Sequence, residues 1–221
     1  MTLFLDSAFI DDARQAAELG FVVGITTNPT LINKVLKTEP RAGGIQIKTR
    51  EDLISAMCDV FPGTIMVQLT AETAAERKSE AQRLLGLRPG QIGLKIPSTS
   101  ENFPLAYHFA KEGYTVGMTT IFSPGQAFLA CEAGASIIFP YVNRSTRLLG
   151  DGFALVRQMR AIVDGLKSPI QILAASIKSG EEATNTILAG AHGLTIPLDI
   201  IQALGENPHS QQSILDFAKS E

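Results

Sequence analysis

Short apolar runs alternate with longer segments of helical periodicity along nearly the whole chain. Runs of four to eight residues bounded by Gly, Pro or Asn predict strands, whereas apolar residues at i, i+3, i+4 and i+7 predict helices. The expected strands are 3–7, 21–27, 64–70, 92–97, 114–122, 136–142, 169–176 and 193–198. The expected helices are 8–19, 29–37, 50–60, 71–85, 100–112, 124–133, 152–166, 180–189, 199–204 and a terminal helix, 208–220.

Local signals support these boundaries. Asn28-Pro29 and Ser123-Pro124 each place a capping residue before a proline at the first helical position. Glycines fall where helices should end, at Gly20, Gly113, Gly134 and Gly190.

Strands that alternate with helices predict a parallel sheet, and eight of them fit a closed (β/α)8 TIM barrel with a terminal helix. A doubly wound open sheet is the alternative. No Gly- or Pro-rich linker, repeat or low-complexity tract interrupts the chain, so we expect one domain over 1–221. The stretch 38–48, with Gly43-Gly44, is the only long irregular segment expected.

Composition narrows the class of protein. Hydrophobic residues make up 45% and the formal charge is −3, so there is no basic surplus for nucleic-acid binding. No apolar run reaches the roughly 18 residues of a membrane span, and Asp6 comes too early for a signal peptide. Cys58 and Cys131 are expected to be reduced thiols. We therefore expect a cytoplasmic globular protein.

Polar residues stand at the carboxyl ends of most predicted strands, where barrels build their active sites. They are Asp6, 26–28, Gln68, Lys95, Thr119, 141–144 and 176–178. Inward-facing positions are often small, and we expect Gly24, Gly93, Gly117 and Ala174 to leave room for a ligand.

Lys95 is the sharpest candidate, because its neighbours Leu94 and Ile96 point to the helices and Lys95 therefore points into the barrel. Burial disfavours the charged amine and lowers its pKa. A neutral amine attacks a carbonyl and forms an iminium, which draws electrons from an adjacent C–C bond. The alternative is a structural ion pair with Asp6.

The other candidates form two sets. Asp6 and Asn28 hold a hydroxyl or relay a proton, or else cap strand ends. Gln68, Thr119 and Tyr141 together position a water for acid–base work, although an inward tyrosine is also common in cores.

Arg144, Ser176 and Lys178 bring two cations and a hydroxyl to adjacent strand ends, with a helix beginning just beyond Ser179. This set suits a phosphate. Each cation taken singly is interpreted equally well as a solvated surface charge.

Several chemistries have no residues to support them. His108, His192 and His209 all lie away from strand ends, so we expect no metal site. There is no Walker or dinucleotide glycine loop and no Gly-x-Ser-x-Gly elbow, so no cofactor is expected.

Seven segments, in order, resemble the small transaldolases and fructose-6-phosphate aldolases, which are class I, Schiff-base enzymes. They are Leu-Phe-Leu-Asp-Ser (3–7), Gly-Ile-Thr-Thr-Asn-Pro-Thr (24–30), Leu-Lys-Ile-Pro (94–97), Phe-Ser-Pro-Gly-Gln-Ala (122–127), Pro-Tyr-Val-Asn-Arg (140–144), Leu-Ala-Ala-Ser-Ile-Lys (173–178) and Ile-Pro-Leu-Asp (196–199). The resemblance implies a Schiff base on Lys95, proton handling by Asp6 and donor binding by Asn28. It also implies phosphate binding by Arg144, Ser176 and Lys178, and a homo-oligomer in the family pattern of pentameric rings or decamers.

Within the family, transaldolases resemble one another in a glutamate at the position of Gln68, a phenylalanine at Tyr141 and an asparagine at Gly117. This chain resembles the aldolase branch at Gln68 and Tyr141, which implies cleavage of a fructose 6-phosphate-type substrate into a dihydroxyacetone-type donor and glyceraldehyde 3-phosphate. Alternatives are a transaldolase of the pentose phosphate pathway, a relative acting on a sulfonated sugar, and a binding barrel that has lost turnover.

Phe139 departs from the family, which carries a small residue there. It shares the inward parity of Tyr141 two residues on, so we expect its ring one layer below the iminium carbon. A ring there crowds the pocket for the dihydroxyacetone unit, and we expect hydroxyacetone to be the better donor. From the resemblance we also expect a shorter carboxyl-terminal tail than the one that family members pack against a neighbouring subunit.

Overall fold

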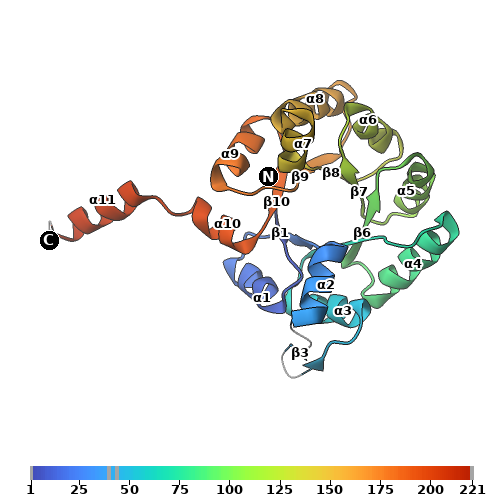
Figure 1. Cartoon of the computed structure of the whole chain (residues 1–221), viewed down its shortest axis with the longest axis horizontal. Coiled ribbons are helices and arrows are strands. Elements are labelled where there is room, and N and C mark those ends of the chain that lie inside the picture. Colours follow the sequence, from blue (N-terminus) through green and yellow to red (C-terminus); the bar gives the residue numbers. More distant parts are fainter. Residues whose placement is uncertain (1, 39–40, 43–44, 220–221) are drawn as a thin grey trace.

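The computed structural model describes residues 2–38, 41–42 and 45–219. Parallel strands close into a barrel in the order β1-β10-β9-β8-β7-β6-β5-β2 (Figure 1). The strands are β1 Thr2–Asp6, β2 Gly24–Thr26, β5 Thr64–Gln68, β6 Ile92–Pro97, β7 Val116–Ile121, β8 Ile137–Pro140, β9 Gln171–Ala174 and β10 Gly193–Ile196. The predicted (β/α)8 barrel is therefore confirmed, and closure excludes the open sheet.

The helices surround the barrel and follow the predicted order. They are α1 Ile10–Leu19, α2 Pro29–Thr38, α3 Arg50–Val60, α4 Ala74–Leu87, the 3₁₀ turn η1 Ser100–Asn102, α5 Phe103–Lys111, α6 Pro124–Glu132, α7 Val142–Leu149, α8 Gly152–Gly165, α9 Gly180–Leu188, α10 Leu198–Leu204 and α11 Pro208–Ala218. The predicted cap at Ser123 is present as a full capping box with Gln126. The four predicted helix-end glycines all have positive φ.

Three elements were not predicted: the helix α7 and the short strands β3 and β4. The strand expected over 136–142 ends at Pro140, and α7 begins at Val142. Only Val142 and Ser145 of α7 are buried, and the two leucines at its end are exposed, so few apolar residues mark this short helix in the sequence. In the stretch expected to be irregular, β3 Arg41–Ala42 pairs antiparallel with β4 Ile45–Gln46; positions 39–40 and 43–44 lie outside the described residues.

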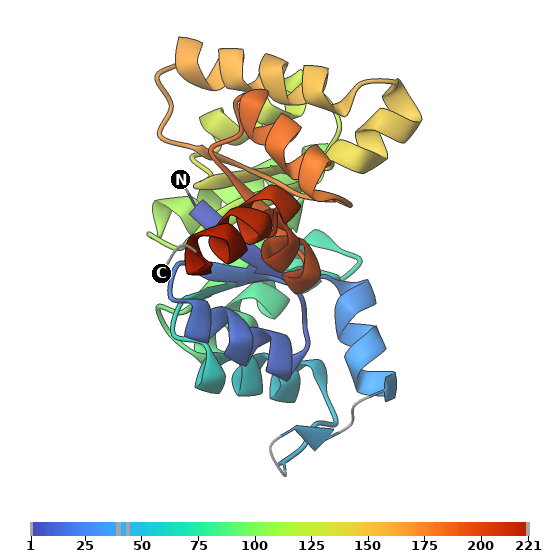
Figure 2. The same cartoon turned by 90° about the vertical axis from the view of Figure 1, so that its left-hand side faces the viewer.

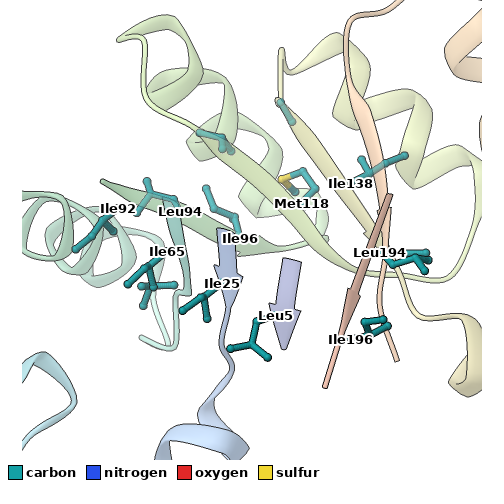
Figure 3. Packing of buried hydrophobic residues seen from close by; sticks show 14 of the residues in the cluster. Leu5, Ile25, Ile65, Ile92, Leu94, Ile96, Met118, Ile138, Leu194 and Ile196 are labelled. Carbon is teal, nitrogen blue, oxygen red and sulfur yellow. The ribbon is translucent and has the colours of Figure 1, made fainter. Parts of the chain in front are cut away.

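The barrel strands separate two apolar clusters. Alternate side chains point outward against the helices, among them Leu5, Ile25, Leu94 and Ile138 (Figure 3). The opposite parity fills the interior of the barrel with a small cluster made of Phe4, Met66, Ile137, Phe139, Leu173 and Ala175. The interior is thus packed, as in other barrels of this type, and a site is expected at the end of the barrel formed by the carboxyl ends of the strands.

Helix α11 leaves the body of the barrel instead of packing on it (Figure 1), and in the view turned by 90° it lies in front of the barrel (Figure 2). All its residues are exposed, including Ile214 at 65%, Leu215 at 56% and Phe217 at 74%. Among the described residues, no helix has the length and apolar character needed to cross a membrane.

Candidate active site

A cavity of about 440 Å³ opens at the carboxyl ends of the barrel strands. Most of the predicted site residues line it: Asp6, Asn28, Gln68, Lys95, Tyr141, Arg144, Ser176 and Lys178. The remaining two, Thr119 and Phe139, are buried next to it. The prediction missed Pro29, Thr30, Leu31, Thr120 and Ala175, which also line the cavity.

Lys95 lies on β6 and is only 2% exposed. Its Nζ is 3.4 Å from the Thr27 carbonyl oxygen and 5.0 Å from the centre of the Phe139 ring. Burial lowers the pKa of Lys95, and the nearby Asp6 carboxylate opposes that shift. The amine therefore faces the cavity from an apolar floor that favours its neutral form.

Asp6 ends β1 and accepts a hydrogen bond at Oδ1 from Thr26 Oγ1, 3.0 Å away. Burial raises the pKa of Asp6, although Lys95, the Thr26 hydroxyl and Lys178 each counteract this. Burial therefore pushes Asp6 and Lys95 toward their neutral forms while their mutual attraction opposes it. Such a pair can exchange a proton at modest cost.

Asn28 caps the first turn of α2, as the Asn28-Pro29 pair predicted, whereas its alternative interpretation was the capping of a strand end. Its Oδ1 accepts a hydrogen bond from the Leu31 amide at 3.1 Å, in the first turn of α2. This bond uses the carbonyl half of the side chain and fixes its orientation at the cavity wall. Capping and ligand binding are thus compatible here.

Thr119 and Tyr141 form the hydrogen-bonded part of the predicted acid–base set. Thr119 Oγ1 lies 3.2 Å from the Tyr141 hydroxyl oxygen. Burial raises the pKa of Tyr141, against smaller opposing effects of Thr119 and Arg144. Gln68 Oε1 is buried and has no hydrogen-bond partner among the described residues, so it can still accept one from a ligand or a water.

Arg144, Ser176 and Lys178 meet at one side of the cavity. Arg144 belongs to α7 and not to a strand end, which corrects its predicted position; its guanidinium carbon lies 4.9 Å from the centre of the Tyr141 ring. Ser176 and Lys178 lie just before α9, whose N-cap is Ser179. Two cations thus line this side of the cavity, and the first turn of α9 beside them carries Glu181 and Glu182.

Two residues at the cavity have a left-handed backbone that costs non-glycine residues about 1–3 kcal/mol. They are Thr120, with φ 57°, and Ser176, with φ 59°. The β7–β8 register shifts between Met118 and Ile121, which turns Thr120 toward the cavity. Nothing in the Thr-Thr sequence signals this shift, so Thr120 was missed.

The floor of the cavity corrects one prediction about small residues. A Cβ on Gly24, Gly93 or Gly117 would lie only 2.1–2.4 Å from Phe4, Met66 or Phe139 respectively. These glycines therefore accommodate large side chains from neighbouring strands and leave no room for a ligand. Ala174 was predicted to point inward, but it belongs to the outer cluster, while Ala175 faces the cavity.

Phe139 lies where strand parity predicted it, fully buried beneath Lys95 and two residues below Tyr141. Its ring covers Gly117, so the two positions are sterically coupled.

A closed (β/α)8 barrel whose polar cavity surrounds a buried lysine places this protein among the barrel enzymes. Residues 3–221 match the family model described as Transaldolase/Fructose-6-phosphate aldolase. The chain is similar to proteins named probable transaldolase from Prosthecochloris aestuarii (34% identity, covering 98% of this chain and 96% of that protein) and Thermus thermophilus (33%, covering 94% and 92%). A third, also named probable transaldolase, is from Alkaliphilus metalliredigens (32%, covering 99% and 97%). The chain belongs to the transaldolase/fructose-6-phosphate aldolase family and is an enzyme.

Proposed function

We propose that this enzyme cleaves and forms a C–C bond of a sugar phosphate through a Schiff base on Lys95, and that it acts as a fructose 6-phosphate aldolase. The observation that carries the proposal is the lysine amine buried at the floor of a polar cavity. Burial lowers the pKa of Lys95 and so favours the neutral amine that carbonyl attack requires, against the opposing effect of Asp6.

The reaction begins when the Lys95 amine attacks C2 of the open-chain sugar and water leaves, which forms an iminium. Asp6 takes the proton of the C4 hydroxyl, the C3–C4 bond breaks, and its electron pair moves to the iminium nitrogen. Glyceraldehyde 3-phosphate leaves and an enamine remains. Protonation at C3 and attack of water at C2 then release dihydroxyacetone and the free amine.

The remaining residues are assigned by where they line the cavity. Arg144, Ser176 and Lys178 bind the phosphate through charge-assisted hydrogen bonds, and Asn28 binds a donor hydroxyl. Gln68, Thr119 and Tyr141 hold the water that transfers protons to and from the donor. No cofactor or metal takes part in this scheme.

A transaldolase is the second candidate function, because the similar curated proteins are named probable transaldolase. Chemically the two differ only in the fate of the enamine. It is protonated and released to water in the aldolase, and it attacks a second aldehyde in the transaldolase. Gln68 and Tyr141 support the first outcome, since neither supplies the carboxylic acid that the transaldolase pattern has at position 68.

Borohydride reduction tests the covalent step. With fructose 6-phosphate, the intact mass should rise by one reduced donor unit, and peptide mapping should place it on Lys95. Lys95→Ala and Lys95→Met should lose both adduct and turnover while remaining folded, whereas Lys111→Arg, an exposed lysine on α5, should keep both. An adduct on another lysine would refute the assignment, and no adduct at all would favour a binding barrel.

The reaction products distinguish an aldolase from a transaldolase. We expect free dihydroxyacetone from fructose 6-phosphate with no acceptor present, at a rate that erythrose 4-phosphate does not increase by more than a few-fold. Transfer to erythrose 4-phosphate without release to water would establish the transaldolase. Competition by inorganic phosphate, but not by methanesulfonate, would set aside a sulfonated sugar as the substrate.

We further propose that residues 1–221 form one cytoplasmic domain that assembles into a homo-oligomer. The cytoplasmic location is supported by Cys58 and Cys131, which are both free thiols. Assembly is supported by α11, because its exposed apolar residues gain nothing from their own barrel.

A further inference from the structure

The hydroxyl groups of Thr26 and Thr195 form a row with the Asp6 carboxyl group. Asp6 lies on β1, and Thr26 and Thr195 lie on the two strands that flank it, β2 and β10. Thr26 Oγ1 is 3.0 Å from Asp6 Oδ1 and 2.6 Å from Thr195 Oγ1. Parallel pairing sets Thr26 beside Asp6, and Thr195 beside Phe4 one layer lower. Both threonines are buried, at 0% and 1% exposure, so bulk water does not compete for these bonds.

The number of protons available to each group determines which group donates in each hydrogen bond of the row. An ionised carboxylate only accepts hydrogen bonds, and a hydroxyl has a single proton to donate. Because Thr26 donates its proton to Asp6, Thr195 must be the donor in the 2.6 Å contact. The row therefore runs from Thr195 through Thr26 to the Asp6 carboxylate.

The same row can serve protonated Asp6. The carboxylic acid then donates to Thr26, and Thr26 donates to a lone pair of Thr195. Only the two hydroxyl hydrogens rotate, and no covalent bond changes. A backbone amide in the place of Thr26 would serve the carboxylate alone, since it cannot accept.

We propose that Thr195 is a positioning residue for Asp6, which it serves through Thr26 as a reversible two-hydroxyl chain that satisfies the carboxyl group in both of its protonation states. The proposal rests on the proposed function, in which Asp6 gains and loses a proton in each turnover. The Thr26 hydrogen bond also favours the carboxylate against the raised pKa that burial gives Asp6.

The charged and titratable groups that act on Asp6 come from other elements: Lys95 from β6, Lys178 from the segment before α9, and Tyr141 after β8. Thr26 and Thr195 are uncharged, so replacing them leaves these groups in place. A change in the Asp6 pKa can then be assigned to the hydroxyl chain.

The test compares Thr26→Val, Thr195→Val and Thr195→Ser in the full chain. The Asp6 pKa is followed by ¹³C NMR of labelled aspartate, with the resonance assigned by its loss in Asp6→Asn. Thr26→Val removes a charge-assisted bond and should raise the Asp6 pKa by about 1–2 units. Thr195→Val removes only the cooperative support and should raise it by about 0.2–0.5 unit. The apparent pKa on the acidic side of the pH profile of kcat should rise by the same amounts. Thr195→Ser should restore the wild-type values of this pKa and of the Asp6 pKa.

Thr186→Val is the matched control, because Thr186 is equally buried and donates its hydroxyl to the Glu182 carbonyl, away from the cavity. It should lower stability without moving the Asp6 pKa.

If Thr195→Val does not fold, Thr195→Ala takes its place. A Thr195 variant that loses stability but keeps the wild-type Asp6 pKa and kcat profile would overturn the proposal, as would failure of Thr195→Ser to restore them. Should Lys95 form no adduct, the proposed function fails, while the NMR titration still decides the role of Thr195.

Discussion

At the scale of single residues, the charge and the contacts of each side chain at the cavity depend on its neighbours. Lys95 and Asp6 both lie in a buried environment that disfavours charge, and both line a cavity that Arg144 and Lys178 also line. Phe139 makes the floor apolar, and Arg144 stacks over Tyr141 while facing the cavity. We therefore expect separate substitutions to affect donor binding, acceptor binding and proton transfer to different extents.

The phosphate end of the substrate should depend on Arg144. Arg144→Ala should raise KM for glyceraldehyde 3-phosphate by about 10- to 100-fold, because a charge-assisted bond is lost. It should change KM for unphosphorylated glyceraldehyde by less than about 3-fold. Arg147→Ala, an exposed arginine one turn along α7, is the control. Equal effects on both aldehydes would make Arg144 a structural residue that acts through its contact with Tyr141.

The preference of the enzyme for one donor over another should depend on Phe139. The ring offers no hydrogen bond to a C1 hydroxyl, and leaving that hydroxyl unpaired costs about 1–3 kcal/mol. We therefore expect KM to be lower for hydroxyacetone than for dihydroxyacetone. Phe139→Ser should lower KM for dihydroxyacetone, while Phe139→Ala, which adds space without a hydroxyl, should lower it less. If wild-type enzyme binds dihydroxyacetone tightly and Phe139→Ser changes nothing, the ring has no role in donor choice.

Steric coupling between Phe139 and Gly117 gives an independent check of the floor. A Cβ at position 117 would lie 2.4 Å from the ring, so Gly117→Ala should destabilise the wild type by about 1–3 kcal/mol. In the Phe139→Ala background the same change should cost much less. Additive effects in a double-mutant cycle of chemical denaturation would show that the ring does not cover Gly117.

At the scale of elements, the end of β5 is tied to two helices by one ion pair. Arg50, at the start of α3, donates to the Gln68 carbonyl oxygen and to Glu80 of α4, 2.5 Å away. Glu80 also accepts from the Thr70 and Ala71 amides at 2.8 and 3.0 Å. This clamp holds the backbone that carries the Gln68 side chain to the cavity.

Breaking the clamp should reduce stability in a pH-dependent way. Burial raises the pKa of Glu80, but its hydrogen bonds outweigh this and leave the pKa below the ordinary value. The stabilisation is therefore present above the unfolded pKa of about 4.3 and is lost as pH falls through the folded value. Glu80→Gln should cost about 1–3 kcal/mol of unfolding free energy at pH 7, and less below pH of about 4. Glu51→Gln, which removes the partner of Arg83, should cost far less. A pH-independent loss in Glu80→Gln would count against this account.

At the scale of the whole molecule, the barrel and α11 have different relations to solvent. The barrel buries its apolar side chains in two clusters, whereas α11 leaves Ile214, Leu215 and Phe217 exposed. Burying such a helix face on a second copy removes apolar surface from water at about 25 cal/mol per Å². The helix is thus the natural contact of the proposed homo-oligomer.

Removing that apolar face should dissociate the assembly and spare the barrel. Leu215→Ser with Phe217→Ser should shift the mass in analytical ultracentrifugation toward the monomer, with Lys95 adduct formation retained. Gln211→Ala, a polar position on the same helix, should leave the mass unchanged. If the double variant keeps the wild-type mass, another surface holds the subunits together, and a monomeric wild type would refute the homo-oligomer itself.

Much of this protein follows from the sequence alone, because strand and helix periods are local properties of the chain. The 92–97 strand has the bounds predicted for it, and period-2 alternation pointed Lys95 and Phe139 inward. Parallel strands share one carboxyl edge, so most predicted site residues were certain to meet there once the barrel closed.

Other features were decided only by tertiary structure, since they depend on what a neighbouring strand contributes. The inward glycines gave no sign that Phe4, Met66 and Phe139 would fill the space above them. Thr120 reached the cavity through a register shift between β7 and β8, which a single strand cannot encode. The Thr195–Thr26–Asp6 row joins residues 169 and 20 positions apart. Alternation along a strand indicates the face of most side chains, although it failed at Ala174 and Thr120. Barrel stagger determines which side chains share a layer, and therefore which hydroxyl groups and which side-chain volumes meet.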